Sequence, residues 1–243
     1  MQLLSYVLIL GVLLAILYLL QRAVVNNLSF FSYRLTKKGT VGVYLYFLFF
    51  LPGIILHELA HLFTALILGV PAGQLALFPR QKNEEENGSN NWVLGSVMTV
   101  ETDILRTGLI GFAPMFLGIF CMMIIVMFGL GIKEINDIGN FWFSLGIGYP
   151  VWQAVLLIYL LMAVTNTMFL SKEDRSGIWI VPGILLILFL VLNFFGLQFS
   201  SEILGFITQV ILIINFCFGI TCLVNFLFLI PLSLLRSIIA SRE

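Results

Sequence analysis

Charged residues are scarce in this chain, and that scarcity decides its broad class. Only 10% of the 243 residues are charged, whereas 60% are hydrophobic. Burying so much apolar surface inside a soluble domain is not feasible, so the composition predicts a membrane protein surrounded by a lipid bilayer. The 12 basic residues are balanced by 12 acidic ones. Because there is no excess of positive charge, a nucleic-acid partner is excluded.

Long apolar runs predict an all-α polytopic membrane fold with about six transmembrane helices. A helix needs roughly 20 apolar residues to cross about 30 Å of hydrocarbon. The chain contains no evident internal repeat or appended soluble module, so residues 1–243 are expected to form a single membrane domain. The six runs lie at residues 2–20, 41–70, 107–131, 142–170, 178–197 and 205–230.

The only sizeable polar insertion, residues 71–106, separates the second run from the third. Within it, residues 74–78 and 92–100 are short segments with β-prone side chains, joined by residues typical of turns. This pattern predicts a small membrane-associated β-hairpin. The edge of such a hairpin, if it lies beside a catalytic site, could bind a substrate as an additional strand.

Histidine and cysteine are also rare. The three cysteines lie in apolar runs, where we expect them to serve as packing residues. The only two histidines, His57 and His61, flank Glu58 in an H-E-x-x-H motif inside the second apolar run. A charged side chain at the bilayer centre costs roughly 2.5 to 3.5 kcal/mol on insertion scales. Three ionisable residues this close together therefore require a stabilising partner.

The H-E-x-x-H motif predicts that this partner is zinc. Residues i and i+4 lie on one face of a helix, so His57 and His61 can both bind one ion, while Glu58 lies beside them as a general base. The alternative is that all three are buried polar residues that hydrogen-bond to neighbouring helices. Because ionisable residues inside a membrane usually mark a functional site, the pattern favours the metal site.

A catalytic zinc usually has three protein ligands, and the chain has no third histidine. The third ligand is therefore expected to be a carboxylate. The second and fourth runs should cross the membrane in the same direction, which favours the acidic residues just after the fourth run. Glu173 and Asp174 meet this condition, and Glu101 and Asp103 of the insertion remain as further candidates. The remaining acidic residues near the membrane are Glu134, Asp137 and Glu202.

Together, these residues resemble the motifs of the site-2 protease family of intramembrane zinc metalloproteases. In that family, H-E-x-x-H is completed by an aspartate in an N-x-x-P-x-x-x-L-D-G pattern. Asn166 and Asp174 keep the eight-residue separation of this asparagine and aspartate. The surrounding residues differ from the pattern, because Phe169, Glu173 and Arg175 stand where it has proline, leucine and glycine. The segment that ends in Pro114 resembles the A-G-P motif of the family.

The resemblance covers residues 41–177 as a protease-like core, and it implies both a site and a reaction. Asp174 would join His57 and His61 as the third zinc ligand. Asn166 would orient the substrate or stabilise the oxyanion, although an interhelical hydrogen bond is an equally good account of this residue without the resemblance. The active site would lie on the cytoplasmic side of a multi-pass protein, which we expect in the cytoplasmic membrane of a prokaryote.

The sequence thus predicts a zinc metalloendopeptidase that cleaves a membrane protein in or near its transmembrane segment. Glu58 would act as the general base. Two other classes remain. One is a zinc-binding membrane adaptor without proteolytic activity, in which a general base would have no use. The other is a metal transporter, which is disfavoured because the first, third and fifth apolar runs contain no ionisable residue.

Overall fold

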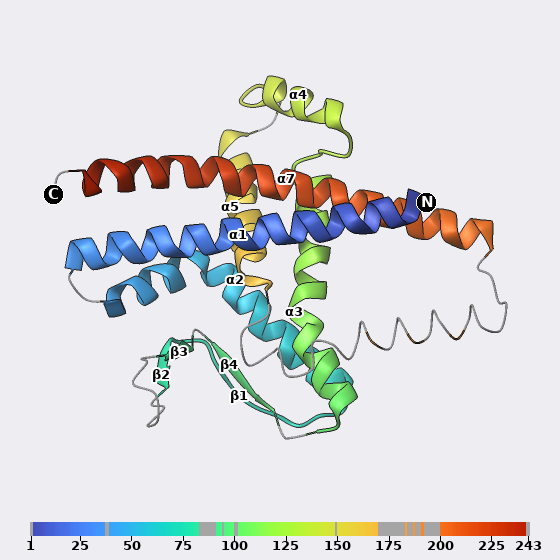
Figure 1. Cartoon of the computed structure of the whole chain (residues 1–243), viewed down its shortest axis with the longest axis horizontal. Helices are drawn as coiled ribbons and strands as arrows, with labels where there is room; N and C mark the ends of the chain where they lie inside the picture. The colour runs from blue at the N-terminus through green and yellow to red at the C-terminus, as the bar shows by residue number, and fades with distance from the viewer. Residues whose placement is uncertain are drawn as a thin grey trace.

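The structure, a computed structural model, is mainly helical (Figure 1). It describes residues 2–36, 39–82, 91–93, 95–99, 102–148, 150–169, 183, 187, 191 and 200–241. The helices are α1 (Gln2–Thr36), α2 (Gly39–Ile67), α3 (Ile104–Ile124), α4 (Ile135–Ser144), α5 (Val151–Thr167) and α7 (Ser201–Ala240), and a π-helical segment, η1 (Ile125–Gly129), continues α3. The strands are β1 (Ala72–Ala76), β2 (Arg80–Lys82), β3 (Asn91–Val93) and β4 (Ser96–Thr99).

Four helices in the described part of the chain are long and apolar enough to cross a membrane, which supports a helical membrane protein. They cover Leu3–Phe31, Val41–Ile67, Ile104–Gly129 and Ser201–Ala240. Helix α5 is also apolar but has only 17 residues. The prediction of six spans is not confirmed, since the run at 178–197 lies outside the described residues except for three positions.

The fourth apolar run, residues 142–170, is not one continuous helix. Helix α4 ends at Ser144, and the chain then turns through Gly146, whose φ of 84° is a conformation that glycine adopts readily. Pro150 caps the start of α5 in an extended conformation. Hydropathy alone does not register this break, because a glycine turn and a proline add little polarity to an apolar run.

Helices α2 and α5 pack in parallel with a constant sequence offset. The Tyr159 hydroxyl donates to the Phe49 carbonyl at 2.8 Å, and the His57 ring contacts the Thr167 carbonyl, each pair being 110 residues apart. Between these contacts, a Cβ at Gly53 would overlap the Ala163 carbonyl oxygen. The absence of a side chain therefore lets the two backbones meet directly, as small residues often do between membrane helices. The expected common direction of these two segments is confirmed.

Helix α3 runs antiparallel to α5 and completes the three-helix group around the histidines. A Cβ at Gly118 would lie 2.6 Å from Met168 Cβ, near the end of α5. At the other end of the contact, a Cβ at Gly129 would lie 3.3 Å from the side chain of Leu157. These close approaches bring the C-terminal end of α5 against the middle of α3. The carbonyl groups of both helices are thereby placed near α2.

Helices α1 and α7 lie side by side and run in the same direction (Figure 1). The Asn215 amide donates to the Tyr6 carbonyl, and the Arg236 guanidinium donates to Asn27, with an offset of 209 residues in both pairs. Six successive crossings would make the first and last spans antiparallel. If both helices cross the bilayer, the parallel register instead requires an odd number of crossings, counting both of them.

The polar insertion forms the expected hairpin. Strand β1 pairs with β4 and β2 pairs with β3, both antiparallel, so the two short sheets follow one another along a single extended hairpin. The β1–β4 register shifts between Ala72 and Leu75, which interrupts the ladder. Strands β1 and β4 both contact α2. This contact brings the hairpin to the helix that carries the H-E-x-x-H motif.

Candidate metal centre

The two histidines of the motif face one another with their Nε2 atoms. His57 Nε2 lies 3.2 Å from His61 Nε2, and the rings are inclined by 78°. Two nitrogen ligands of a tetrahedral zinc, each at about 2.05 Å from the metal, are separated by about 3.3 Å. The observed separation therefore matches one edge of a tetrahedral zinc site. The one-turn spacing of the pair on α2 produces this match directly.

The Nδ1 atoms of both rings are held by backbone carbonyl groups from other helices. His57 Nδ1 lies 2.7 Å from the Thr167 carbonyl oxygen in α5, and His61 Nδ1 lies 2.8 Å from the Ile110 carbonyl oxygen in α3. A carbonyl oxygen can only accept, so each Nδ1 must carry a proton. In a neutral ring the proton is then absent from Nε2, which leaves a lone pair there for a metal.

The third residue of the motif, Glu58, is buried with an exposed fraction of 6% and lies against the hairpin. A Cβ at Gly95 would be 2.6 Å from Glu58 Oε1 and 2.8 Å from its Cδ. Glycine at position 95 therefore leaves the space that the carboxyl group occupies. A larger residue there would require the Glu58 side chain to move, so the hairpin helps to determine where this carboxyl group lies.

The third ligand is not identified among the described residues, which contain no cluster of three or more histidine, cysteine, aspartate or glutamate side chains suited to a metal ion. Asp103 caps α3 by accepting from the Arg106 backbone N–H at 3.0 Å, and this hydrogen bond together with the Arg106 guanidinium holds the pKa of Asp103 below its usual value. Three of the sequence candidates, Glu101, Glu173 and Asp174, lie outside the described residues.

The other acidic candidates are placed at helix starts. Asp137 accepts from the backbone N–H groups of Lys133 and Glu134, both at 2.9 Å, and these bonds lower its pKa. Glu202 lies exposed in the first turn of α7. Carboxylates at these positions stabilise helix N-termini. Their local hydrogen bonds and exposure explain their presence without a metal.

Asn166 lies at the end of α5, next to Thr167, whose carbonyl contacts His57. The amide group of Asn166 nevertheless points towards α7. Its Nδ2 donates to Asn225 Oδ1 at 2.6 Å and to the Met162 carbonyl at 2.8 Å. This is the interhelical hydrogen bond that the sequence left open as an alternative. The buried Asn166 Oδ1 has no hydrogen-bond partner within the described part of the chain. A role of Asn166 towards substrate stays a prediction.

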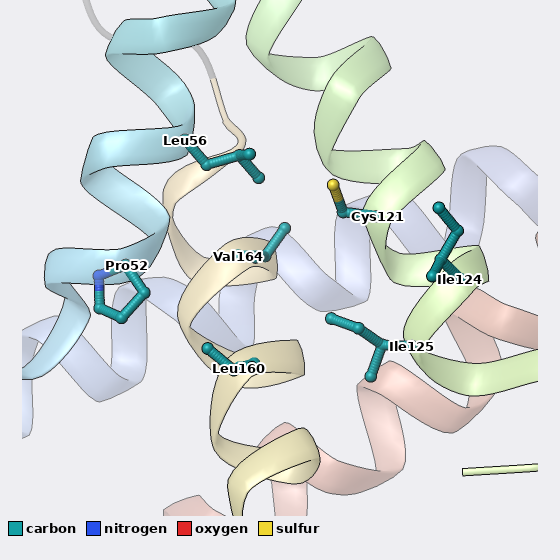
Figure 2. A pocket seen from close by; sticks show the side chains of 7 residues that line it. All are labelled: Pro52, Leu56, Cys121, Ile124, Ile125, Leu160 and Val164. Atoms are coloured by element: carbon teal, nitrogen blue, oxygen red, sulfur yellow. The ribbon is translucent and has the colours of Figure 1, made fainter. Parts of the chain in front are cut away.

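An apolar cavity of about 260 Å³ lies between α2, α3 and α5 (Figure 2). Leu56, which immediately precedes His57, forms part of its wall together with Pro52 of the same helix. Val164 on α5 lies one turn before Thr167 and faces the same space. The cavity thus adjoins the turn of α2 that carries His57, and it provides a surface for apolar side chains. The remaining lining residues are Cys121, Ile124, Ile125 and Leu160.

Comparison with protein-family models, curated proteins and solved structures gave no match to this chain. The arrangement of the site must therefore be interpreted from its own chemistry. Sequence reasoning did not identify the carbonyl groups of Ile110 and Thr167 or the contact of Gly95 with Glu58. The only sequence signals for these contacts are a proline four residues after Ile110, the end of a helix at Thr167 and a glycine in the hairpin.

Proposed function

We propose that this protein is an intramembrane zinc endopeptidase that cleaves a membrane-protein substrate in or near its transmembrane segment. The observation that carries the proposal is the pair of Nε2 atoms 3.2 Å apart, with both Nδ1 atoms anchored to carbonyl groups. Anchoring of Nδ1 to a backbone carbonyl is the usual support for a zinc-binding histidine. The adjacent buried Glu58 adds a group that a purely structural metal site does not need.

His57 and His61 would hold the zinc, and Asp174 is proposed as the third ligand. When bound, zinc supplies Lewis acidity, which polarises the scissile carbonyl and makes water easier to deprotonate. Glu58 accepts a proton from the attacking water as its oxygen bonds to the carbonyl carbon. The same carboxyl group then returns the proton to the amide nitrogen as the C–N bond breaks. Asn166 is proposed to orient the substrate backbone.

The surroundings of the histidines support an extended, apolar peptide as substrate. The hairpin lies against Glu58 through Gly95, so a peptide added along its edge would pass the general base. The apolar cavity beside Leu56 would receive a hydrophobic side chain of that peptide. A transmembrane segment that has unwound locally meets both requirements.

The proposed function predicts new protein termini inside transmembrane segments. Membranes of cells that produce the wild-type protein should contain peptides newly cut in or near such segments, and membranes with Glu58→Gln protein should lack them. Terminal proteomics by mass spectrometry measures this difference. Adding a zinc chelator should remove the new termini, and zinc should restore them. Identical termini in the two samples, with zinc bound to the wild-type protein, would favour the non-proteolytic adaptor instead.

The third ligand is tested by comparing two neighbouring carboxylates. Asp174→Ala should lower the zinc content of the purified protein and abolish cleavage, because a site with two histidines alone is incomplete. Glu173→Ala provides the matched control and should retain nearly one zinc per chain. Elemental analysis of both variants gives the answer. Loss of zinc in Glu173→Ala or Glu101→Ala, with zinc retained in Asp174→Ala, would reassign the ligand.

A further inference from the structure

His61 is held by a carbonyl group that an ordinary helix would already use. Its Nδ1 lies 2.8 Å from the carbonyl oxygen of Ile110, which is in the interior of α3 rather than at its end. In an α-helix, such an oxygen accepts the backbone N–H four residues later. His57 presents no such difficulty, because its partner Thr167 is the last residue of α5, where carbonyl groups lack helical donors.

The residue four positions after Ile110 is Pro114, which has no backbone N–H. We propose that Pro114 is a positioning residue for the metal centre. By withholding the helical donor, it leaves the Ile110 carbonyl available to His61. The proline ring also crowds the carbonyl of residue i−4. The inference rests on the metal site of the proposed function.

The Ile110 carbonyl and the His61 ring each provide what the other needs in this buried environment. Ile110 has an exposed fraction of only 7%, and a buried carbonyl inside a membrane is strongly unfavourable if it has no donor. His61 supplies that donor, so the carbonyl orients the ring while the ring satisfies the carbonyl.

The contact with Ile110 determines the direction of the lone pair on His61 Nε2, which would bind the metal. With its Nδ1–H bound to Ile110, His61 keeps the tautomer in which Nε2 is free of hydrogen and directed at His57. An N–H at position 114 would compete for the same oxygen. The His61 ring would then populate other orientations and the other tautomer, and zinc binding would weaken.

Three variants distinguish the effect of the missing N–H from the effect of the proline ring. Pro114→Ala introduces an N–H together with a flexible backbone. Incorporation of lactic acid at position 114 gives the same methyl side chain with an ester oxygen in place of the N–H. Pro231→Ala in α7 serves as the matched control, because it also removes a proline from a long apolar helix but at an exposed position.

The first measurement needs no zinc. His57 and His61 are the only histidines, so ¹⁵N-histidine NMR of metal-free protein in detergent reports on this pair alone. In the wild type, the His61 ring should be protonated at Nδ1. Pro114→Ala should lower that tautomer population, while the lactic acid variant and Pro231→Ala should retain it. An unchanged tautomer in Pro114→Ala, or an equal change in the lactic acid variant, would overturn the role of the missing N–H.

The second measurement is the zinc dissociation constant from chelator competition. Loss of a hydrogen-bond partner to a metal-binding histidine typically weakens metal affinity about 10- to 100-fold. We expect a loss in this range for Pro114→Ala and little change for the other two variants. Failure of the wild type to bind zinc would refute the proposed function. Tight zinc binding by both the wild type and Pro114→Ala would refute only the inference about Pro114.

Discussion

Replacing His57 or His61 by alanine is expected to remove most of the zinc from a protein that otherwise binds about one ion per chain. Each substitution deletes one of two nitrogen ligands whose separation of 3.2 Å fits a tetrahedral site. The remaining imidazole and one carboxylate are too few ligands to hold the ion tightly. Elemental analysis of protein purified with limiting zinc measures the loss.

Asn215→Ala is a suitable control for these histidine variants. Asn215 is also buried and polar, but it donates to the Tyr6 carbonyl at the α1–α7 contact. Its replacement should lower thermal stability and leave the zinc content near one. A protein with both histidines replaced that still bound stoichiometric zinc would exclude this metal site. The close Nε2 atoms would then be better explained by a shared proton.

Glu58→Gln is expected to reduce cleavage by 10² to 10⁴-fold while leaving the zinc and the fold in place. The amide has nearly the size and shape of the carboxyl group, so it fits the space left by Gly95. It has no basic oxygen to accept a proton from water, and loss of a general base commonly has an effect of this size. Single-turnover cleavage, zinc content and thermal unfolding should be measured on the same preparation.

Glu202→Gln provides the matched control, because Glu202 is an exposed carboxylate in the first turn of α7. Its cleavage rate should stay within about twofold of wild type, as expected for a surface residue away from the reacting groups. If Glu58→Gln lost zinc as completely as His57→Ala, Glu58 would be a ligand or a structural support rather than the base.

Much of the architecture was predictable from local patterns. Apolar length predicts α1, α2, α3 and α7 as candidate spans, because the energy of burial in hydrocarbon depends on composition more than on neighbours. The hairpin was also predictable, since its β-prone segments flank residues typical of turns. Position within a helix determines that His57 and His61 share one face. These features depend on residues close together in the chain.

Other features are not detected by hydropathy or motif spacing. The run at 142–170 is divided by the turn at Gly146, which hydropathy does not detect. The amide of Asn166 hydrogen-bonds to Asn225 on α7, which the motif spacing does not predict. The total number of spans and the third ligand depend in part on residues outside the described ranges. The Gly146 turn is a local feature that hydropathy overlooks, whereas the partner of Asn166 depends on where a second segment packs.

The sequence by itself determined that this is a helical membrane protein and that two histidines and a glutamate share one helical turn. The tertiary structure decided how those histidines are oriented. Close packing at Gly53 and Gly118 brings α5 against α2 and α3. The carbonyl groups of Thr167 and Ile110 then hold the two Nδ1 atoms, so both Nε2 atoms face each other. Helical periodicity places side chains on a face, but only packing supplies the partners that orient them.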